Sequence, residues 1–298
     1  MFSIMKSSKY CYIISAAIIL IGIIFLVVNG GFATDIDFSG GCKMVISTQG
    51  GNNVNEGTIK KAVESCGFDF YGIVNMSGDS QMQVKTSTID SVEDRVKVYE
   101  AIKKATGITE ESYLSCENIS ATLSTDLLKN AILALVVAVA GILIYIYFRF
   151  EFAAGVAAVI ALLHDSLIMI SVYAIFRFTV NSTFVAAILT IVGYSVNATI
   201  VVFDRIRENR KYVGKSSFED VCEKSIRQTL RRTVNTTITT LISLIVLYIL
   251  GAESVKAFAL PLIIGVLVGT YSSIMLAAPL WKLIRGNGNT GNKKAKKA

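Results

Sequence analysis

Long apolar blocks alternate with short polar segments along this chain, and six of them are long enough to cross a membrane. A helix that spans the hydrocarbon needs about 20 mostly apolar residues, because it covers ~30 Å at 1.5 Å per residue. The lipid interior satisfies no free backbone groups, so such blocks are expected to be helices. The six predicted spans are Tyr10–Asn29, Leu127–Phe148, Ala153–Phe176, Ser182–Phe203, Thr233–Leu250 and Phe258–Ile284.

The first apolar block has Lys6 and Lys9 before it, as a secretory signal peptide would. It is longer than the 7–15 residues of a typical signal core, and no small-x-small cleavage site follows it. The pattern therefore favours a retained signal-anchor helix, and residues 1–29 are predicted to form a tail and the first span.

Residues 30–126 are more polar and are predicted to form one small α+β domain between the first two spans. Its patterns predict strands and helices in the order β-α-β-β-α-β, which is typical of a ferredoxin-like fold. In the second helix, the three- and four-residue spacing predicts one face made of Val92, Val96, Tyr99, Ile102 and Lys103. The predicted elements are Cys42–Ser47, Asn55–Cys66, Asp69–Val74, Gln81–Lys85, Ile89–Thr106 and Ser112–Ser120.

Residues 127–298 are predicted to hold the other five spans, an amphipathic surface helix over 216–231 and a basic tail. Ser216 followed by Glu219 is the pattern of a capping box, and the apolar stripe after it has basic residues opposite, as in a helix lying on a membrane surface. In the last span, Gly265 and Gly269 form a GxxxG pair, followed by Ser272 and Ser273, that permits close helix packing.

Charge sets the predicted orientation. The chain carries a formal net charge of +7, and with six crossings its basic segments fall on one side. The positive-inside rule places both termini and the basic loop in the cytoplasm and the net acidic segment 30–126 outside. The basic tail is expected to contact anionic lipid headgroups rather than nucleic acid.

The five cysteines point to no metal site or disulfide framework. Three of them, Cys42, Cys66 and Cys116, lie in the outer segment, and their odd number and irregular spacing match no zinc or disulfide pattern. One pair could bridge, but three small buried side chains are the favoured interpretation.

Ionisable and amide side chains inside the spans are the strongest functional signal, because such groups are costly in lipid and usually face other helices or a water-filled path. His164 and Asp165 interrupt the third span. In the fourth, Thr190, Asn197 and Asp204 recur every seven residues. A polar stripe in the fifth comprises Arg232, Asn235, Thr236, Thr239, Thr240 and Ser243.

These groups predict a shared polar seam that carries protons or ions, with Asp165, Asn197, Arg232, His164 and Thr236 as its candidate residues. The competing interpretation is that the hydroxyls only make hydrogen bonds of about 0.6 kcal/mol each; for the threonines it is the favoured one. For Asp165 and Arg232 function is favoured, since a charge near the hydrocarbon costs at least ~2.5 kcal/mol. Arg232 sits at a helix end, where it could instead snorkel to the interface.

Several motifs give the sequence a resemblance to the SecF branch of the SecD/SecF family, which is related to the resistance-nodulation-division transporters. The TIVVFDRIREN passage within a transmembrane context is the most specific of them. The others fit the same pattern in order along most of the chain. The motifs are Asp35–Gly41 (DIDFSGG), Tyr147–Phe150 (YFRF), Leu163–Asp165 (LHD), Phe184–Asn197, Thr199–Asn209 and Gln228–Thr233.

The resemblance implies an auxiliary protein-export subunit of the bacterial plasma membrane. It implies a SecD partner, the SecYEG channel and the SecA motor nearby, and use of an ion gradient to draw preproteins outward. No enzymatic activity, cofactor or metal is expected. The matching motif residues beyond the seam are Asp37, Phe38, Gly40 and Gly41 at the start of the outer segment, and Asp204, Arg205 and Arg207 at the cytoplasmic end of the fourth span.

One departure from the family pattern matters. The family usually has Asn-Asp in the fourth span, and here the pair is Asn197-Ala198. Alanine cannot exchange a proton, so the hypothesis is that a membrane aspartate of SecD titrates, with Asp165 as a secondary candidate. Two alternatives stay open: a half-transporter that exports a lipid or small molecule, and a scaffold whose seam is only structural. An enzyme is disfavoured, because no nucleophile lies near the lone His–Asp pair.

Overall fold

The structure, a computed structural model, describes residues 4–48, 54–76, 81–108, 113–211 and 217–285. Six of its helices are long and apolar enough to cross a membrane, which confirms the six predicted spans. They are α1 (Ile4–Val28), α5 (Ala121–Arg149), α6 (Phe152–Phe176), α7 (Ser182–Arg210), α8 (Phe218–Leu250) and α9 (Glu253–Met275). A short helix, α10 (Ala277–Arg285), follows them.

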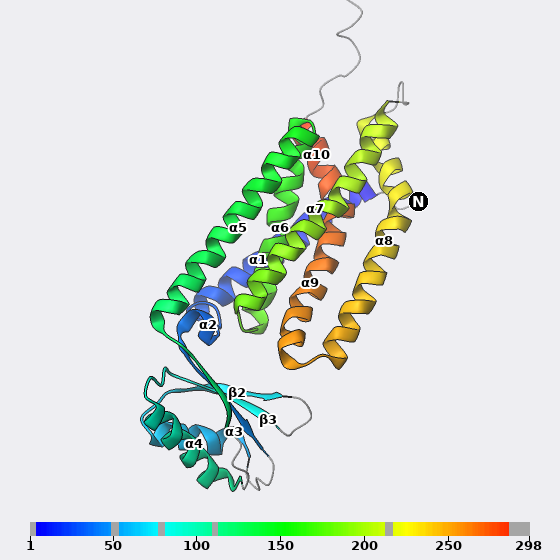
Figure 1. The fold of residues 1–298 in the computed structure, drawn as a ribbon. Helices are drawn as coiled ribbons and strands as arrows, with labels where there is room; N and C mark the ends of the chain where they lie inside the picture. The colour runs from blue at the N-terminus through cyan, green and yellow to red at the C-terminus, as the bar shows by residue number, and fades with distance from the viewer. Residues whose placement is uncertain (1–3, 49–53, 77–80, 109–112, 212–216, 286–298) are drawn as a thin grey trace, which may run out of the picture.

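The centre of the helix bundle is formed by α6, α7 and α9, which bury far more of their spans than the other three. Small residues allow this close packing: Ala157, Ala161 and Ala187 are almost fully buried. The outer helices α1, α5 and α8 leave most of their apolar side chains exposed, as expected for surfaces that face lipid or another membrane chain. The start of α1 and the whole of α10 lie at the end of the bundle opposite the sheet (Figure 1).

Two boundaries differ from the sequence prediction. The predicted last span, Phe258–Ile284, is broken at Leu276 into α9 and α10. Pro279 explains the break, because in a continuous helix its ring would clash with the carbonyl of Met275 and it has no N–H to donate there. The predicted surface helix over 216–231 is not separate either: its described part is the first turns of α8, which continues unbroken into the fifth span.

The capping box of α8 is one residue later than predicted. Ser217 is the N-cap and accepts from the Asp220 backbone N–H, while the Asp220 carboxylate accepts from the Ser217 backbone. Ser216, the predicted cap, lies outside the described residues.

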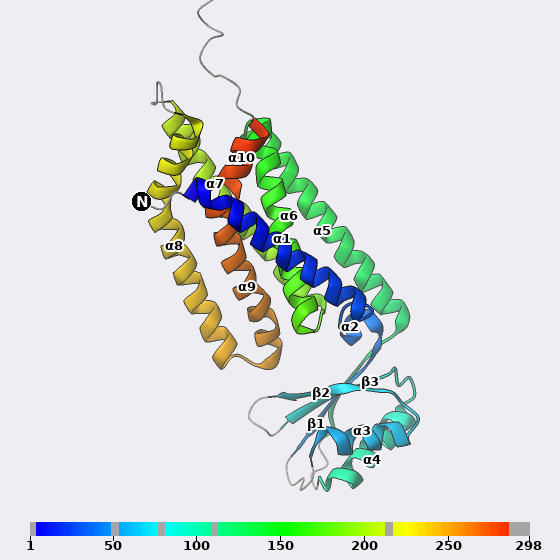
Figure 2. The same cartoon turned by 180° about the vertical axis from the view of Figure 1, so that it is seen from behind.

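The outer segment forms the predicted ferredoxin-like domain. Its elements are α2 (Ile36–Ser39), β1 (Gly41–Ser47), α3 (Glu56–Ser65), β2 (Phe70–Met76), β3 (Gln81–Thr86), α4 (Val92–Thr106) and β4 (Tyr113–Ile119). The strands form an antiparallel sheet in the order β2-β3-β1-β4. Helices α3 and α4 lie on one face of it (Figure 2).

The core of this domain follows from strand and helix periodicity. Met82 and Val84 alternate inward on β3, and Ile59 and Val63 of α3 belong to the same buried core with no exposed surface. The predicted apolar face of α4 is partly wrong, since Val92 is 70% and Val96 is 48% exposed. The buried residues of α4 are Val98, Ile102 and Thr106, whose four-residue spacing sets them on one face of the helix.

Candidate functional site: a buried carboxylate between three helices

Asp165 lies at the centre of the bundle, with 1% of its surface exposed. Its Oδ2 accepts hydrogen bonds from Ser195 Oγ of α7 and from Ser272 Oγ of α9, the latter at 2.8 Å. Its Oδ1 lies 2.9 Å from Nδ1 of the neighbouring His164. One carboxyl group of α6 therefore ties the three central helices together, and both of its oxygens are satisfied.

Glycines on α9 make this geometry possible. A Cβ at Gly269 would lie 3.1 Å from the Cβ of Ser195, and one at Gly265 would lie 2.5 Å from Ile191. The two helices therefore approach closely enough for hydroxyls from both to reach one carboxylate. The sequence assigned the GxxxG pair to packing alone, and neither Ser195 nor Ser272 was among the predicted seam residues. Ser272 could have been predicted from its spacing, because a residue three positions after Gly269 lies on the same face of the helix.

His164 extends the polar cluster toward α1. Its side chain is 13% exposed, and its Nε2 is buried with no hydrogen-bond partner among the described residues. Its ring lies 6.3 Å from that of Tyr271, whose hydroxyl donates to the Cys11 carbonyl of α1 at 3.1 Å. A carboxyl group and an imidazole in contact are groups that can pass a proton between them.

The other predicted seam residues form a second cluster. Asn197, Ala198, Arg232 and Thr236 line a cavity of about 70 Å³ between α7 and α8. Asn197 and Arg232 are exposed, on the side of α7 away from Asp165. Ser195 and Asn197 are two positions apart, and at 3.6 residues per turn this places them about 200° apart on the helix. The predicted single seam is therefore two sites on opposite faces of α7.

The hydroxyls of the α8 stripe mostly bond to their own helix. Thr236 donates to the Arg232 carbonyl at 2.9 Å, and Thr239 and Thr240 both donate to the Thr236 carbonyl at 2.9 Å. Thr237, beside this stripe, also reaches another helix, with its hydroxyl 2.8 Å from that of Thr270 on α9. The hydroxyls of Thr236, Thr239 and Thr240 therefore donate to backbone carbonyls of α8 itself. Hydrogen bonds of this kind do not connect into a path for protons.

The motif of Asp204, Arg205 and Arg207 forms a network near the C-terminal end of α7. Arg149 of α5 donates to both oxygens of Asp204, at 3.1 and 2.9 Å. Arg205 bonds to Gln228 of α8 at 2.7 Å and to Glu208 at 2.6 Å. Arg207 lines a pocket of about 520 Å³ with other basic side chains. These contacts hold the ends of α5, α7 and α8 together.

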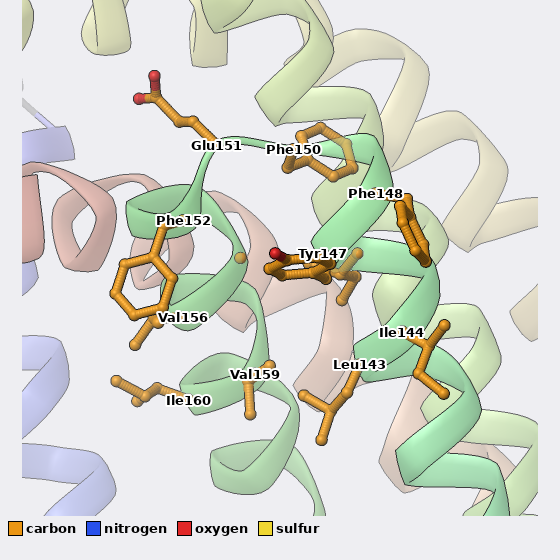
Figure 3. Close-up of a pocket in the computed structure, with 12 residues that line it drawn as sticks. Leu143, Ile144, Tyr147, Phe148, Phe150, Glu151, Phe152, Val156, Val159 and Ile160 are labelled. Carbon is orange, nitrogen blue, oxygen red and sulfur yellow. The ribbon is translucent and has the colours of Figure 1, made fainter.

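A larger cavity lies between α5 and α6 near the same end. It measures about 560 Å³ and is lined by apolar side chains such as Tyr147, Phe152 and Val159, which face one another across the hairpin (Figure 3). Glu151 is the one acidic residue of its lining. Asp165 and its serine partners are not part of this lining, so the cleft is separate from the Asp165 site.

At the opposite end, an ionic cluster joins the outer domain to the bundle. Lys43 donates to Asp37 at 2.8 Å and Lys85 donates to Asp35 at 2.8 Å. Asp37 also accepts from the backbone N–H of Ser182, the first residue of α7, at 3.1 Å. Burial would raise the pKa of Asp37, but the Lys43 and Ser182 hydrogen bonds outweigh it and hold this pKa below its ordinary value.

The glycines of the same motif are required by the backbone. Gly40 has φ +77° and Gly41 has φ +148°. A Cβ at Gly41 would lie 2.5 Å from the Thr86 carbonyl oxygen. Phe38 is half-buried on the short helix α2. Asp35 and Asp37 both belong to the motif that the sequence identified, whereas Lys43 and Lys85 are brought to it by the pairing of β1 with β3, which sets them opposite each other.

The fold and site define a multi-pass membrane protein with a ferredoxin-like domain between its first two spans and a buried carboxylate at its centre. A family model described as "Protein export membrane protein SecD/SecF, C-terminal" matches residues 98–287. The chain belongs to this SecD/SecF family.

Named relatives support this assignment. The chain is 37% identical over 285 residues to protein translocase subunit SecF of Sebaldella termitidis, covering 95% of this chain and 91% of that protein. It is 36% identical over 287 residues to protein translocase subunit SecDF of Bacillus subtilis, covering 93% of this chain. It spans only 37% of that longer protein.

Solved structures agree with the fold. A crystal structure of SecDF from Thermus thermophilus, described as a translocon-associated membrane protein, matches with a TM-score of 0.81 and 32% identity. The match covers 94% of this chain and 38% of that one. A SecDF structure in a super-membrane-facing form has the same identity and coverage but a TM-score of 0.65. The arrangement of this chain is therefore more similar to the first.

Proposed function

We propose that this chain is a SecF-type subunit of the protein-export machinery, which acts with a SecD-type partner and uses an ion gradient to promote preprotein translocation. The names of its relatives support this role. The use of an ion gradient is inferred from Asp165. It is an ionisable group at the centre of the bundle and is hydrogen-bonded to hydroxyls of two other helices. Ionisable groups at such positions are functional by default, because they are costly in lipid.

The geometry supports a specific coupling step. Ionised Asp165 accepts from both serines, whereas protonated Asp165 has an O–H to donate and one fewer oxygen available to accept. Its protonation state therefore changes which hydrogen bonds link α6, α7 and α9. Because α7 begins at Ser182, which bonds to Asp37 of the outer domain, a shift of α7 would be transmitted to that domain.

The cluster at Arg232 supports a partner role. Its cavity lies on an exposed face of α7 and α8, and Ala198 supplies no acid there. A charged side chain at such a depth needs a partner, so we expect a carboxylate from the SecD-type chain to face Arg232 and complete the relay. SecYEG, SecA and the exported chain would then be the wider partners, with the outer domain contacting the emerging preprotein.

The proposed location is the bacterial plasma membrane, with both termini in the cytoplasm. The gathering of Arg205, Arg207 and Arg210 at the end of the bundle opposite the sheet supports this orientation under the positive-inside rule. The outer domain would then face the exporting side.

Asp165→Asn tests the coupling. In membrane vesicles that carry the full export complex, we expect this variant to lose the part of preprotein export that an ionophore abolishes in the original protein, while export driven by ATP alone continues. Asp126→Asn is the matched control, since that carboxylate is exposed on α5 and pairs only loosely with Lys129. Full gradient-dependent export by Asp165→Asn would favour the scaffold alternative, which Ala198 otherwise supports.

Arg232→Leu tests the second cluster in the same assay. We expect gradient-dependent export to fall, because the partner carboxylate would lose its counter-charge. Ala198→Asp adds an acid to the cavity, and we expect it to preserve or raise the gradient-dependent part. Unchanged export by Arg232→Leu would show that Arg232 only snorkels to the membrane surface.

A further inference from the structure

Two cysteines of the outer domain lie in direct contact. The Sγ atoms of Cys42 on β1 and Cys116 on β4 are 2.6 Å apart, and no bond joins them in the structure. A disulfide bond brings the two sulfur atoms to ~2.05 Å, so a small side-chain movement separates this pair from bonding. Cys66, the third cysteine of the domain, is elsewhere, with its Sγ 3.9 Å from the Lys97 carbonyl.

The contact follows from the sheet register. β1 and β4 are antiparallel neighbours, with Cys42 opposite Asn118 and Met44 opposite Cys116. The two cysteines are therefore diagonal neighbours on adjacent strands, although 74 positions separate them in the chain. Diagonal neighbours are usually about 7–8 Å apart, and here the two short side chains point toward each other so that their sulfur atoms meet.

We propose that Cys42 and Cys116 form a disulfide bond that ties together the two strands through which the outer domain is attached to the membrane helices. The proposal rests on the orientation given above, because disulfides form and persist in oxidising compartments outside the cytoplasm. It differs from the sequence interpretation, which favoured small buried thiols.

The bond forms by thiol–disulfide exchange with an extracytoplasmic protein disulfide or a small-molecule disulfide. Cys116 is half-buried and Cys42 is fully buried, so Cys116 is the thiol that the oxidant reaches. Its thiolate attacks one oxidant sulfur to form a mixed disulfide and releases the other as a thiol. Cys42 then attacks Cys116 Sγ and releases the second thiol, so two electrons and two protons pass to the oxidant.

Strand connectivity gives this bond a mechanical role. β1 begins at Gly41, next to Cys42, and is reached from α1 through α2. β4 ends at Ile119 and leads almost directly into α5. A force between the domain and these helices would separate β1 from β4 starting at the end nearest the membrane. The bond lies near that end and would carry the load in place of the hydrogen bonds of the strand pair.

Peptide mass spectrometry of the full chain in native membranes tests the proposal. Thiols are blocked with N-ethylmaleimide without reductant, and the digest is compared with and without dithiothreitol. We expect a linked Cys42–Cys116 peptide pair that disappears on reduction and is retained in Cys66→Ser. Cys42 and Cys116 peptides that are both alkylated without reduction would overturn it.

A second labelling experiment distinguishes the absence of the disulfide bond from a wrong orientation of the chain. A membrane-impermeant maleimide applied to intact cells should label Cys66, whose side chain is partly exposed on the outer domain. Labelled Cys66 with two alkylated thiols at Cys42 and Cys116 would refute the bond alone. Unlabelled Cys66 would refute the orientation and with it the coupling direction proposed above.

A stability readout gives the bond a second test. Reductant should lower the thermal unfolding temperature of the outer domain in the original protein and have no such effect on Cys116→Ser. An equal response of both proteins to reductant would count against the bond.

Discussion

Asp165 shows how a single side chain acquires its setting from three helices. Its two hydroxyl partners, Ser195 and Ser272, lie on α7 and α9 and contribute the donors that a buried carboxylate needs. A hydrogen bond to a charged group contributes roughly 1.5–3 kcal/mol, and leaving such a group without it costs a comparable amount.

Ser272→Ala should therefore destabilise the bundle by roughly 1.5–3 kcal/mol, because Asp165 loses one of its donors. Denaturant unfolding in detergent micelles would measure this. Ser273→Ala is the matched control, since Ser273 is equally buried but donates only to the Thr270 carbonyl of its own helix. Similar losses in both variants would mean that the Ser272 contact with Asp165 adds no stability.

Among the elements, the contact between α7 and α9 depends on the absence of side chains at two positions. Their contact passes through Gly265 and Gly269, where any Cβ meets Ile191 or Ser195. The predicted spans and strands agree with the structure because hydrophobic length and alternation are local properties of the chain. The break at Leu276 was not predicted, and the helix cap at Ser217 was predicted one residue too early. Helix caps and breaks depend on one or two residues each, so a pattern read over many residues does not locate them.

Gly265→Ala should destabilise the α7–α9 contact by about 1–3 kcal/mol, as overpacking in a tight core generally does. Gly193→Ala provides the comparison, because a Cβ on that residue of α7 would meet nothing within 4 Å. The measurement is the midpoint of unfolding of each variant in detergent. A Gly265→Ala midpoint equal to that of Gly193→Ala would show that α9 shifts to accept the methyl group.

Across the whole molecule, the outer domain and the bundle meet at the Asp35, Asp37, Lys43 and Lys85 cluster. The parallel bridge of Thr34 with Val180 lies beside it. The two SecDF structures match this chain with different TM-scores, which is consistent with more than one arrangement of such a domain. A change in the arrangement of the domain and the bundle would have to alter the contacts of this cluster.

Acid should loosen this contact. Because the pKa of Asp37 is lower in the folded protein, its contribution to stability is fully present above the ordinary carboxyl pKa of ~3.9. It is lost as the pH falls below that value and through the lowered folded pKa. Asp37→Asn should remove this acid-dependent step. Hydrogen exchange at the Ser182 amide across the pH range would measure it, and an identical profile in Asp37→Asn would contradict the assignment.

By itself, the sequence determined the six spans, the ferredoxin-like order of strands and helices, and the positions of the costly polar residues. These depend on periodicity and length within short stretches. Only the tertiary structure decided which polar groups meet. Two residues along a helix turn a side chain to the opposite face, which separated Asn197 from Asp165 and brought Ser195 to it. Strand pairing likewise joined Cys42 to Cys116 over a separation that no local pattern records.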